Sequence, residues 1–183
     1  SRGLGDVYKR QVPVLVNEGH FLPTQGPRFV ELYNKSSSSI DLGGFHLSDD
    51  FSNLSAFTIP DGTIIPARGF VFFTEAQLGM DLSIVEDVRE RVSIALTNPA
   101  ATRVVDARIF EPKVLGRSEA RYPDGQESFA RAALPSPGEA NETGVVRDVI
   151  FNEIMYHPIS GLDRDEFVEF FNRGDGALSL IHI

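Results

Sequence analysis

The stretch "RFVELY" (28–33) decides the fold class, because its apolar and polar side chains alternate. Successive side chains of an extended strand point to opposite faces, so we expect Val30 and Leu32 on one face and Glu31 on the other. Burial of a valine or leucine side chain stabilises a fold by roughly 1.5–3 kcal/mol. The pattern therefore predicts a strand whose Val30 and Leu32 face lies in a hydrophobic core.

Similar short segments, bounded by Gly, Pro, Asn and Asp, occur along most of the chain. Besides 28–33, we expect strands at 12–16, 44–48, 56–60, 62–66, 69–74, 92–96, 103–110, 118–122 and 127–132. Only 75–91 has the pattern of a helical turn or a long loop. Many short strands with frequent turns predict an all-β domain, either a β-sandwich or a closed barrel.

A second copy of the pattern begins about one domain later. Asn17-Glu18 corresponds to Asn152-Glu153, and Phe29-Val30-Glu31 corresponds to Phe167-Val168-Glu169. The small and polar stretch "SPGEANETG" (136–144) precedes the second copy and is typical of a linker. The second copy supplies about two strands, which are too few to bury a core. We expect it to be poorly ordered or to lie against the first module.

The two ends of the chain can be encoded by one DNA sequence and its reverse complement. "DVYKRQ", before Val12, is encoded by GAT GTG TAT AAG AGA CAG, and the reverse complement encodes the final "LSLIHI". We interpret both ends as a translated sequencing adapter and set them aside, as one does with a tag. The expected organisation is adapter translation over 1–11, a module over 12–142, a linker over 143–147, a truncated second module over 148–177 and adapter translation over 178–183.

Composition narrows the classes of function. The 183 residues include no cysteine, which excludes disulfides, thiol catalysis and thiolate metal sites. The formal net charge of −9 argues against nucleic-acid binding, which needs clustered Lys and Arg. No apolar run approaches the ~20 residues that span a bilayer, so we expect no membrane insertion. Carboxylates interleave the basic residues of the late strands, which are Arg103, Arg108, Lys113, Arg117, Arg121 and Arg131.

An ordered set of motifs resembles one known family. The motifs are "NE" (17–18), "FVELYN" (29–34), "IDLGGFHLSD" (40–49), "FTIPDGTIIPARGF" (57–70), "GRSEARYPDG" (116–125) and "SPGEAN" (136–141). Together they resemble the lamin-tail domain in its bacterial form, with Phe45 at a position that is commonly Trp. "NEIMYHP" (152–158) and "EFVEFFNRGDGA" (166–177) resemble the start of another copy. The resemblance implies an immunoglobulin-like β-sandwich that serves as an accessory module in large exported or cell-surface bacterial proteins.

The histidines outside the terminal segments, His20, His46 and His157, do not form a recognisable catalytic motif. The chain has no Gly-x-Ser-x-Gly elbow and no His-Glu-x-x-His pair. A surface or core position is the favoured interpretation for His46, and a loop role for His157. We therefore expect no catalytic residues, no enzyme activity and no cofactor.

Glu18 and Glu31, which recur as Glu153 and Glu169, are the candidates for a binding site. Paired carboxylates can act as acid and base or can hold calcium. The favoured interpretation is that each accepts backbone hydrogen bonds in adjacent strands or faces solvent.

Asp163, Asp165 and Glu166, in "DRDE" (163–166), are the candidate metal ligands. The stretch resembles half of a calcium loop but lacks the spaced ligands and the downstream bidentate Glu, so a solvated turn is favoured. "RGD" (173–175) stands where the first copy has a serine turn, and we interpret it as a turn as well.

We expect a noncatalytic interaction, adhesion or spacer module of a larger secreted or cell-surface bacterial protein. Its partners would be a protein, a glycan or neighbouring domains of the same chain. Two alternatives stay open. One is an accessory module of an extracellular hydrolase or kinase-like enzyme whose catalytic domain lies outside this segment, and the other is a calcium-binding β-sandwich.

Overall fold

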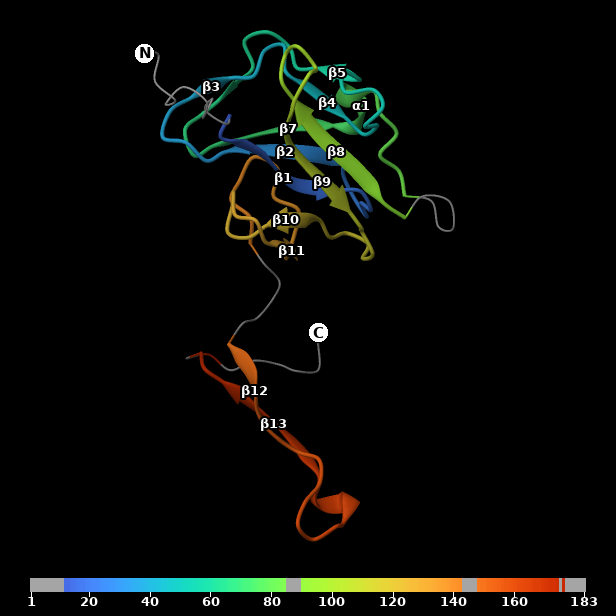
Figure 1. Cartoon of the computed structure of the whole chain (residues 1–183), viewed down its shortest axis with the longest axis vertical. Coiled ribbons are helices and arrows are strands. Elements are labelled where there is room, and N and C mark those ends of the chain that lie inside the picture. Colours follow the sequence, from blue (N-terminus) through green and yellow to red (C-terminus); the bar gives the residue numbers. More distant parts are fainter. Residues whose placement is uncertain (1–11, 85–89, 143–147, 175, 177–183) are drawn as a thin grey trace, which may run out of the picture. The chain divides into compact units, whose positions relative to one another are not determined.

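The computed structural model describes residues 12–84, 90–142, 148–174 and 176. The chain divides into two compact units, Ser1–Gly144 (unit 1) and Val145–Ile183 (unit 2). Figure 1 shows the strands of both units. The segments interpreted as adapter translation, 1–11 and 178–183, and the expected linker, 143–147, lie outside the described residues.

Unit 1 contains two main antiparallel sheets. The five-stranded sheet has the order β11-β10-β1-β2-β7, and the four-stranded sheet has the order β5-β4-β8-β9. The first is built from β1 (Val14–His20), β2 (Phe29–Asn34), β7 (Phe70–Thr74), β10 (Glu119–Arg121) and β11 (Phe129–Arg131). The second is built from β4 (His46–Ser48), β5 (Phe57–Thr58), β8 (Val92–Thr97) and β9 (Val104–Phe110). Two short strands, β3 (Ile40–Asp41) and β6 (Ile64–Ile65), form a separate two-stranded sheet.

Each segment expected to be a strand contains one, so the all-β prediction is confirmed. β3 was not predicted, because it has only two residues. β1 extends beyond its predicted end at residue 16, because the polar Asn17 and Glu18 and the small Gly19 interrupt the apolar pattern. The register of β1 against β2 shifts between Val16 and Glu18, which marks a β-bulge. A bulge adds one residue to one strand and therefore breaks simple alternation.

The core lies between the two main sheets. Val16, Val30 and Leu32 from the first sheet share a buried cluster with Ile94 and Leu96 from the second. The predicted inward face of β2 is thus confirmed. Phe21 and Phe110 also belong to this cluster, with ring centroids 5.0 Å apart. Fully buried side chains of this size each stabilise the fold by roughly 1.5–3 kcal/mol.

The second face of β2 is buried as well, because the chain after β10 passes over it. All six residues of β2 are buried. A Cβ on Gly125 would lie 2.7 Å from the Tyr33 ring, and the backbone nitrogen of Gly138 lies 2.6 Å from the Glu31 carboxylate. The motifs "RYPDG" and "SPGEAN" therefore close the outer face of the first sheet.

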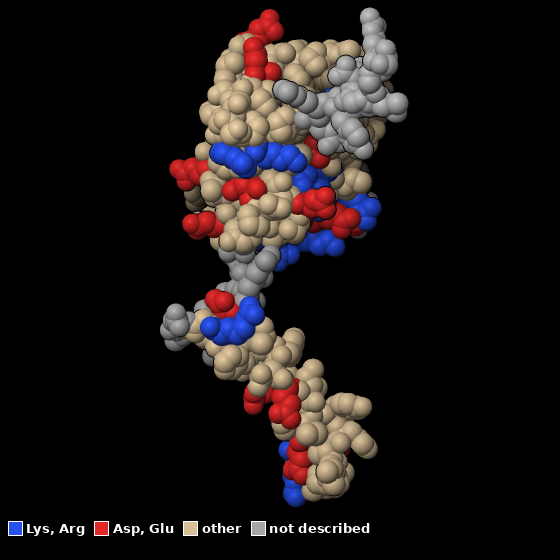
Figure 2. Space-filling model, turned by 60° about the vertical axis from the view of Figure 1, so that its left-hand side comes forward, with Lys and Arg blue, Asp and Glu red and all other residues tan. Residues whose placement is uncertain are grey.

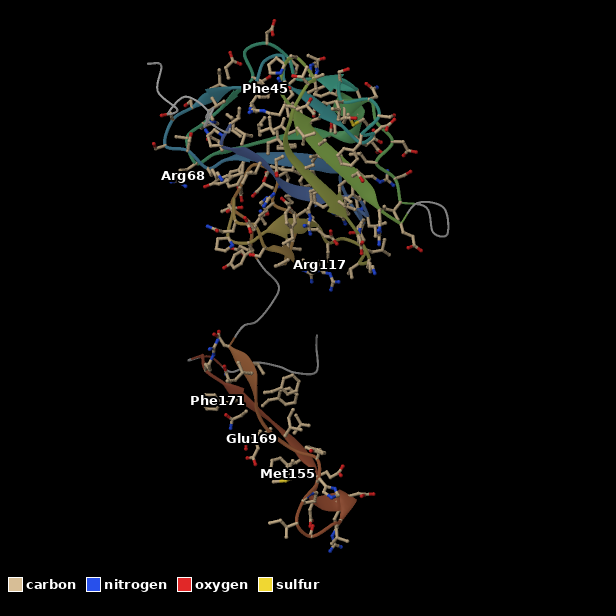
Figure 3. The ribbon with its side chains drawn as sticks, in the orientation of Figure 1. Phe45, Arg68, Arg117, Met155, Glu169 and Phe171 are labelled. Atoms are coloured by element: carbon tan, nitrogen blue, oxygen red, sulfur yellow. The ribbon has the colours of Figure 1, made fainter. Side chains whose placement is uncertain are left out.

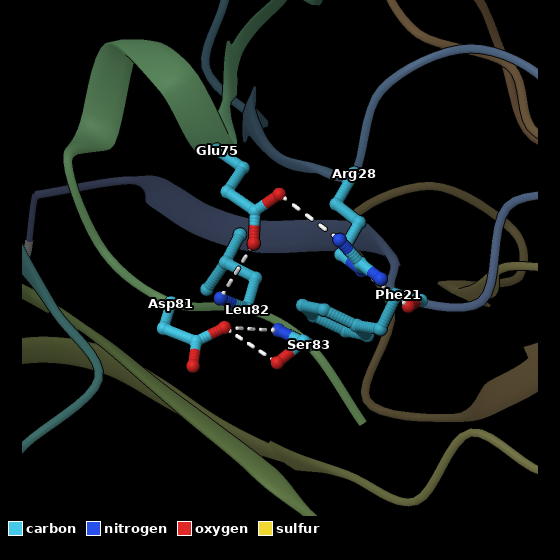
Figure 4. Close-up of polar contacts among 6 residues, drawn as sticks. All are labelled: Phe21, Arg28, Glu75, Asp81, Leu82 and Ser83. Atoms are coloured by element: carbon cyan, nitrogen blue, oxygen red, sulfur yellow. Dashed lines mark hydrogen bonds and ion pairs between the residues drawn. The ribbon is translucent and has the colours of Figure 1, made fainter. Parts of the chain in front are cut away.

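A short helix, α1 (Glu75–Leu78), follows β7, within the segment expected to be a helical turn or loop. Thr74 and Gln77 form a capping box at its start. Arg28 donates from Nη1 to Glu75 Oε2 at 3.1 Å, and Leu82 donates its backbone N–H to Glu75 Oε1 at 2.9 Å (Figure 4). Glu75 therefore ties the chain that follows α1 to the start of β2.

Unit 2 is a hairpin of β12 (Val149–Met155) and β13 (Phe167–Asn172), with a 3₁₀ turn, η2 (Asp163–Asp165), between them. Glu153 stands opposite Glu169, as Glu18 stands opposite Glu31. The register shifts after Phe151, as it does after Val16. The hairpin thus repeats the geometry of β1 and β2.

Polar contacts repeat along with the register. Asn152 donates to Glu169 as Asn17 donates to Glu31, and Asn172 donates to the carbonyl of Gly176 as Asn34 does to that of Ser38. Figure 3 places Glu169 and Phe171 on β13 and Met155 on β12.

The side chains of the hairpin are far more exposed than their counterparts in unit 1. Phe151 is 65% exposed, whereas Val16 at the matching position is fully buried. Within the described part of unit 2, no second sheet covers the hairpin. Whether this segment is poorly ordered or rests on the first module stays a prediction.

Candidate functional site

A pair of carboxylates, Glu18 on β1 and Glu31 on β2, lies at the centre of the outer face of the first sheet. The two residues are direct partners across the strands, and both are 0% exposed. The bulge after Val16 brings Asn17 to the same side, where its Nδ2 donates to Glu31 Oε1 at 3.2 Å. Asn17 Nδ2 also donates to Asp124 Oδ1 at 2.9 Å.

Residues 136–141, which we call the capping segment, close over this carboxylate pair. Ser136 donates to Glu18 from its backbone nitrogen at 3.1 Å and from its hydroxyl at 3.2 Å. Gly138, at a φ of 86°, donates its backbone N–H to Glu31. Asn141 donates from Nδ2 to Asp124 Oδ1 at 2.8 Å. Each carboxylate therefore accepts hydrogen bonds from the capping segment or from the residues beside it.

The hydroxyl of Ser118, the residue before β10, donates a further hydrogen bond to Glu18. The prediction of backbone donors is therefore right for both residues, but the donors belong to the capping segment and not to adjacent strands. The alternative that Glu18 and Glu31 face solvent is wrong, because covering the sheet with 122–141 removes both from water.

Burial is the main influence on the acidity of this pair. Desolvation, reinforced by the charges of Glu18 and Asp124, raises the pKa of Glu31 from 4.5 to about 8, against the opposing hydrogen bonds from Gly138 and Asn17. Desolvation also raises the pKa of Glu18, although hydrogen bonds from Ser118 and Ser136 oppose it. A buried carboxyl group that stays protonated near neutral pH avoids the cost of a second charge beside the first.

The carboxylate pair therefore connects the first sheet to the capping segment through hydrogen bonds. A ligand would reach Glu18 or Glu31 only after residues 136–138 had moved. Among the described residues, no group of three or more His, Cys, Asp or Glu side chains is arranged to hold a metal ion.

The histidines occupy three different settings. His20, at the end of β1, is buried, and its Nδ1 lies 3.0 Å from the carbonyl oxygen of Arg117. Burial makes the largest contribution to the lowered pKa of His20. His46, on β4, is half-buried between the Thr58 hydroxyl and the Pro99 carbonyl oxygen, each at 3.1 Å. His157 is exposed. Within unit 1, His20 and His46 therefore contact different groups.

Asp163, Asp165 and Glu166 lie in and just after η2, and all three are exposed. Ser160 donates its hydroxyl to Asp165 at 2.5 Å, and the Glu166 backbone N–H donates to the Asp163 carbonyl at 3.1 Å. This geometry is that of a turn in contact with solvent.

A hollow that could not be predicted from the sequence lies between β9 and β11. Its cavity volume is about 520 Å³. We call it the arginine groove, and its lining includes Arg91, Arg108, Glu111, Glu119, Phe129 and Arg131. Arg108 and Arg131 are dispersed in the sequence, and only the pairing of strands brings them to one place.

Phe129 is held between two guanidinium groups beside this groove. The Arg108 guanidinium carbon lies 3.9 Å from the centre of the Phe129 ring, and that of Arg121 lies 4.8 Å from it. Arg121 is buried and pairs with Asp106 at 3.0 Å. Within the described residues, Arg108 makes no ion pair, and its buried Nε has no hydrogen-bond partner.

Basic and acidic side chains interleave on the face of unit 1 in Figure 2. This distribution differs from the continuous basic surface of nucleic-acid-binding domains. Among the described residues, no helix is both long and apolar enough to cross a membrane.

Two facing antiparallel sheets that share one hydrophobic core form a β-sandwich. A family model, the Lamin Tail Domain, matches residues 9–110. The chain therefore belongs to the lamin tail domain family, which is a family of noncatalytic, immunoglobulin-like interaction modules. A search of curated proteins found no match. The matched range ends at Phe110, whereas β10 and the capping segment complete the packing around β1 and β2.

Proposed function

We propose that the chain is a noncatalytic interaction and spacer module of a larger bacterial protein that is secreted or held at the cell surface. The repeated hairpin carries this proposal. Unit 2 repeats the register, the bulge and the Asn–Glu contact of β1 and β2, as expected for modules in tandem. Sandwich modules in tandem place a binding surface at a distance from an anchor.

The chemistry of the carboxylate pair supports a structural role over a catalytic one. Glu18 and Glu31 are out of contact with solvent, and their oxygens accept hydrogen bonds from Ser118, Ser136 and Gly138. A general acid or base must reach the proton that it transfers, and these side chains have no free path to a substrate.

Cellular location is tested with an antibody against unit 1 and cells that express the full-length gene. We expect labelling of intact cells or recovery of the protein from the medium. Labelling that appears only after the cells are permeabilised contradicts the proposal.

The sequence of the gene that encodes this chain tests the architecture. We expect it to encode further lamin-tail modules and an export signal. An adjoining hydrolase or kinase-like domain would instead assign the module to an extracellular enzyme.

A further inference from the structure

The arginine groove lies between two edge strands, one from each main sheet. β9 ends the four-stranded sheet, and β11 ends the five-stranded sheet. Edge strands carry backbone groups that no neighbouring strand has paired, and extended peptides bind proteins by lying along such edges. A cavity of about 520 Å³ is within the range of sites that hold small ligands or short peptide segments.

The charges in the groove favour an acidic occupant. Glu111 already pairs with Arg91 at 2.9 Å, and Glu119 accepts the backbone N–H of Glu111 at 3.1 Å. Within the described residues, no carboxylate pairs with Arg108 or Arg131. As far as the described residues show, the groove therefore holds two guanidinium groups without an ion pair, in a chain whose net charge is −9.

The guanidinium group of Arg108 is also held in a fixed orientation that suits a planar carboxylate. Its guanidinium group stacks on Phe129 at 3.9 Å, which limits its rotation. A fixed guanidinium loses less conformational entropy when it binds a carboxylate through paired N–H groups. The groove also has an apolar wall, because Ile109 beside Arg108 is 50% exposed.

We propose that the arginine groove binds an extended acidic peptide segment of a partner protein, with carboxylates on Arg108 and Arg131 and an apolar side chain against Ile109. Alternating acidic and apolar residues suit this arrangement, because a strand presents every second side chain on the same side. Glu111 and Glu119 in the lining repel a dense polyanion, whereas a peptide can space its carboxylates away from them. This inference rests on the proposed role as an interaction module.

The probe is a fluorescent, end-blocked pentapeptide of alternating valine and glutamate, titrated with the full chain at 50 mM and 500 mM salt. The control peptide has glutamine in place of each glutamate. We expect saturable binding of the acidic peptide that weakens at high salt, and at least tenfold weaker binding of the control. A tenfold change is about 1.4 kcal/mol.

Arg108→Gln and Arg131→Gln are expected to weaken binding of the acidic peptide by about tenfold each. Arg131 is exposed, so its replacement is expected to leave folding intact. Arg103→Gln serves as the matched control, because Arg103 is exposed and does not line this groove. Thermal melting of each variant checks that unit 1 stays folded.

Equal binding of the two peptides, or equal affinity in Arg108→Gln, Arg131→Gln and Arg103→Gln, would overturn the proposal. So would binding of inorganic phosphate or of an acidic oligosaccharide without binding of the peptide. Surface labelling of cells together with a failure to bind peptide would refute the groove's role and leave the proposed module function standing.

Discussion

Asp106 on β9 and Arg121 on β10 form an ion pair at 3.0 Å that joins the two main sheets of unit 1. The same two side chains bind the backbone of Val16, where Asp106 Oδ2 accepts its N–H and Arg121 Nε donates to its carbonyl, each at 2.8 Å. Val16 stands at the bulge of β1, where the strand ladder is interrupted. The ion pair therefore supplies the partners that the bulge removes.

Asp106→Ala is expected to destabilise unit 1 by about 3–5 kcal/mol, because it leaves the buried Arg121 without its carboxylate. Urea denaturation measures the change in the free energy of unfolding. Glu111→Ala is the control, since it breaks an exposed ion pair with Arg91 and is expected to cost about 1 kcal/mol or less. Similar losses in the two variants would refute a special role for the inter-sheet pair.

Glu31 is expected to make unit 1 less stable as the pH rises. Its pKa is about 8 in the folded state and near 4.5 in the unfolded chain. Its contribution is therefore complete below pH 4.5 and decreases until it is lost above pH 8, on the order of 1.4 kcal/mol per pKa unit. Glu18 and Asp124 are the two carboxylates whose negative charges help to raise the pKa of Glu31.

Glu31→Gln is expected to flatten this decline, since an amide cannot ionise. Thermal midpoints at intervals from pH 5 to pH 9 measure it, with Glu139→Gln as the exposed control within the capping segment. The pKa of His20 is lowered, so His20 reduces the stability of unit 1 only as the pH falls below 6.5. His20 therefore cannot cause the loss of stability at alkaline pH. Parallel pH profiles for wild type and Glu31→Gln would contradict this prediction.

Gly125→Ala is expected to cost at least about 2 kcal/mol of stability. Gly125 has a φ of 72°, and an added Cβ would lie 2.7 Å from the Tyr33 ring. Gly26→Ala is the matched control, because Gly26 has a φ of 75° but open space around it. We expect about 1 kcal/mol there from backbone strain alone. Equal losses by chemical denaturation would show that the Tyr33 contact has no effect.

Amide hydrogen exchange is expected to separate the two hairpins. The amides of 29–33 in β2 are expected to exchange slowly, because that strand is paired on both sides and buried. The amides of 151–156 are expected to exchange much faster, since a hairpin without a covering sheet is marginally stable. Protection of 151–156 that equals that of 29–33 would show that unit 2 is held by further packing.

Much of the fold could be predicted from local pattern. The alternation of Val30, Glu31 and Leu32 predicted β2 and its buried face, and turn residues separated the other strands. The end of β1 could not be predicted, because the bulge places Asn17 beside Glu18 on the polar side and hides the alternation. For the candidate site, the sequence indicated Glu18 and Glu31 through their repetition, but nothing local indicated that they are buried.

The sequence by itself determined the fold class and the family resemblance, and it predicted a second copy, because alternation, turn residues and ordered motifs are properties of neighbouring residues. Only the tertiary structure decided what the charged residues do. The capping segment reaches Glu18 from 118 positions away, and Arg121 reaches Val16 across 105 positions. Contacts over such separations depend on how the sheets close around the core, and the same closure brings Arg108 and Arg131 to one groove.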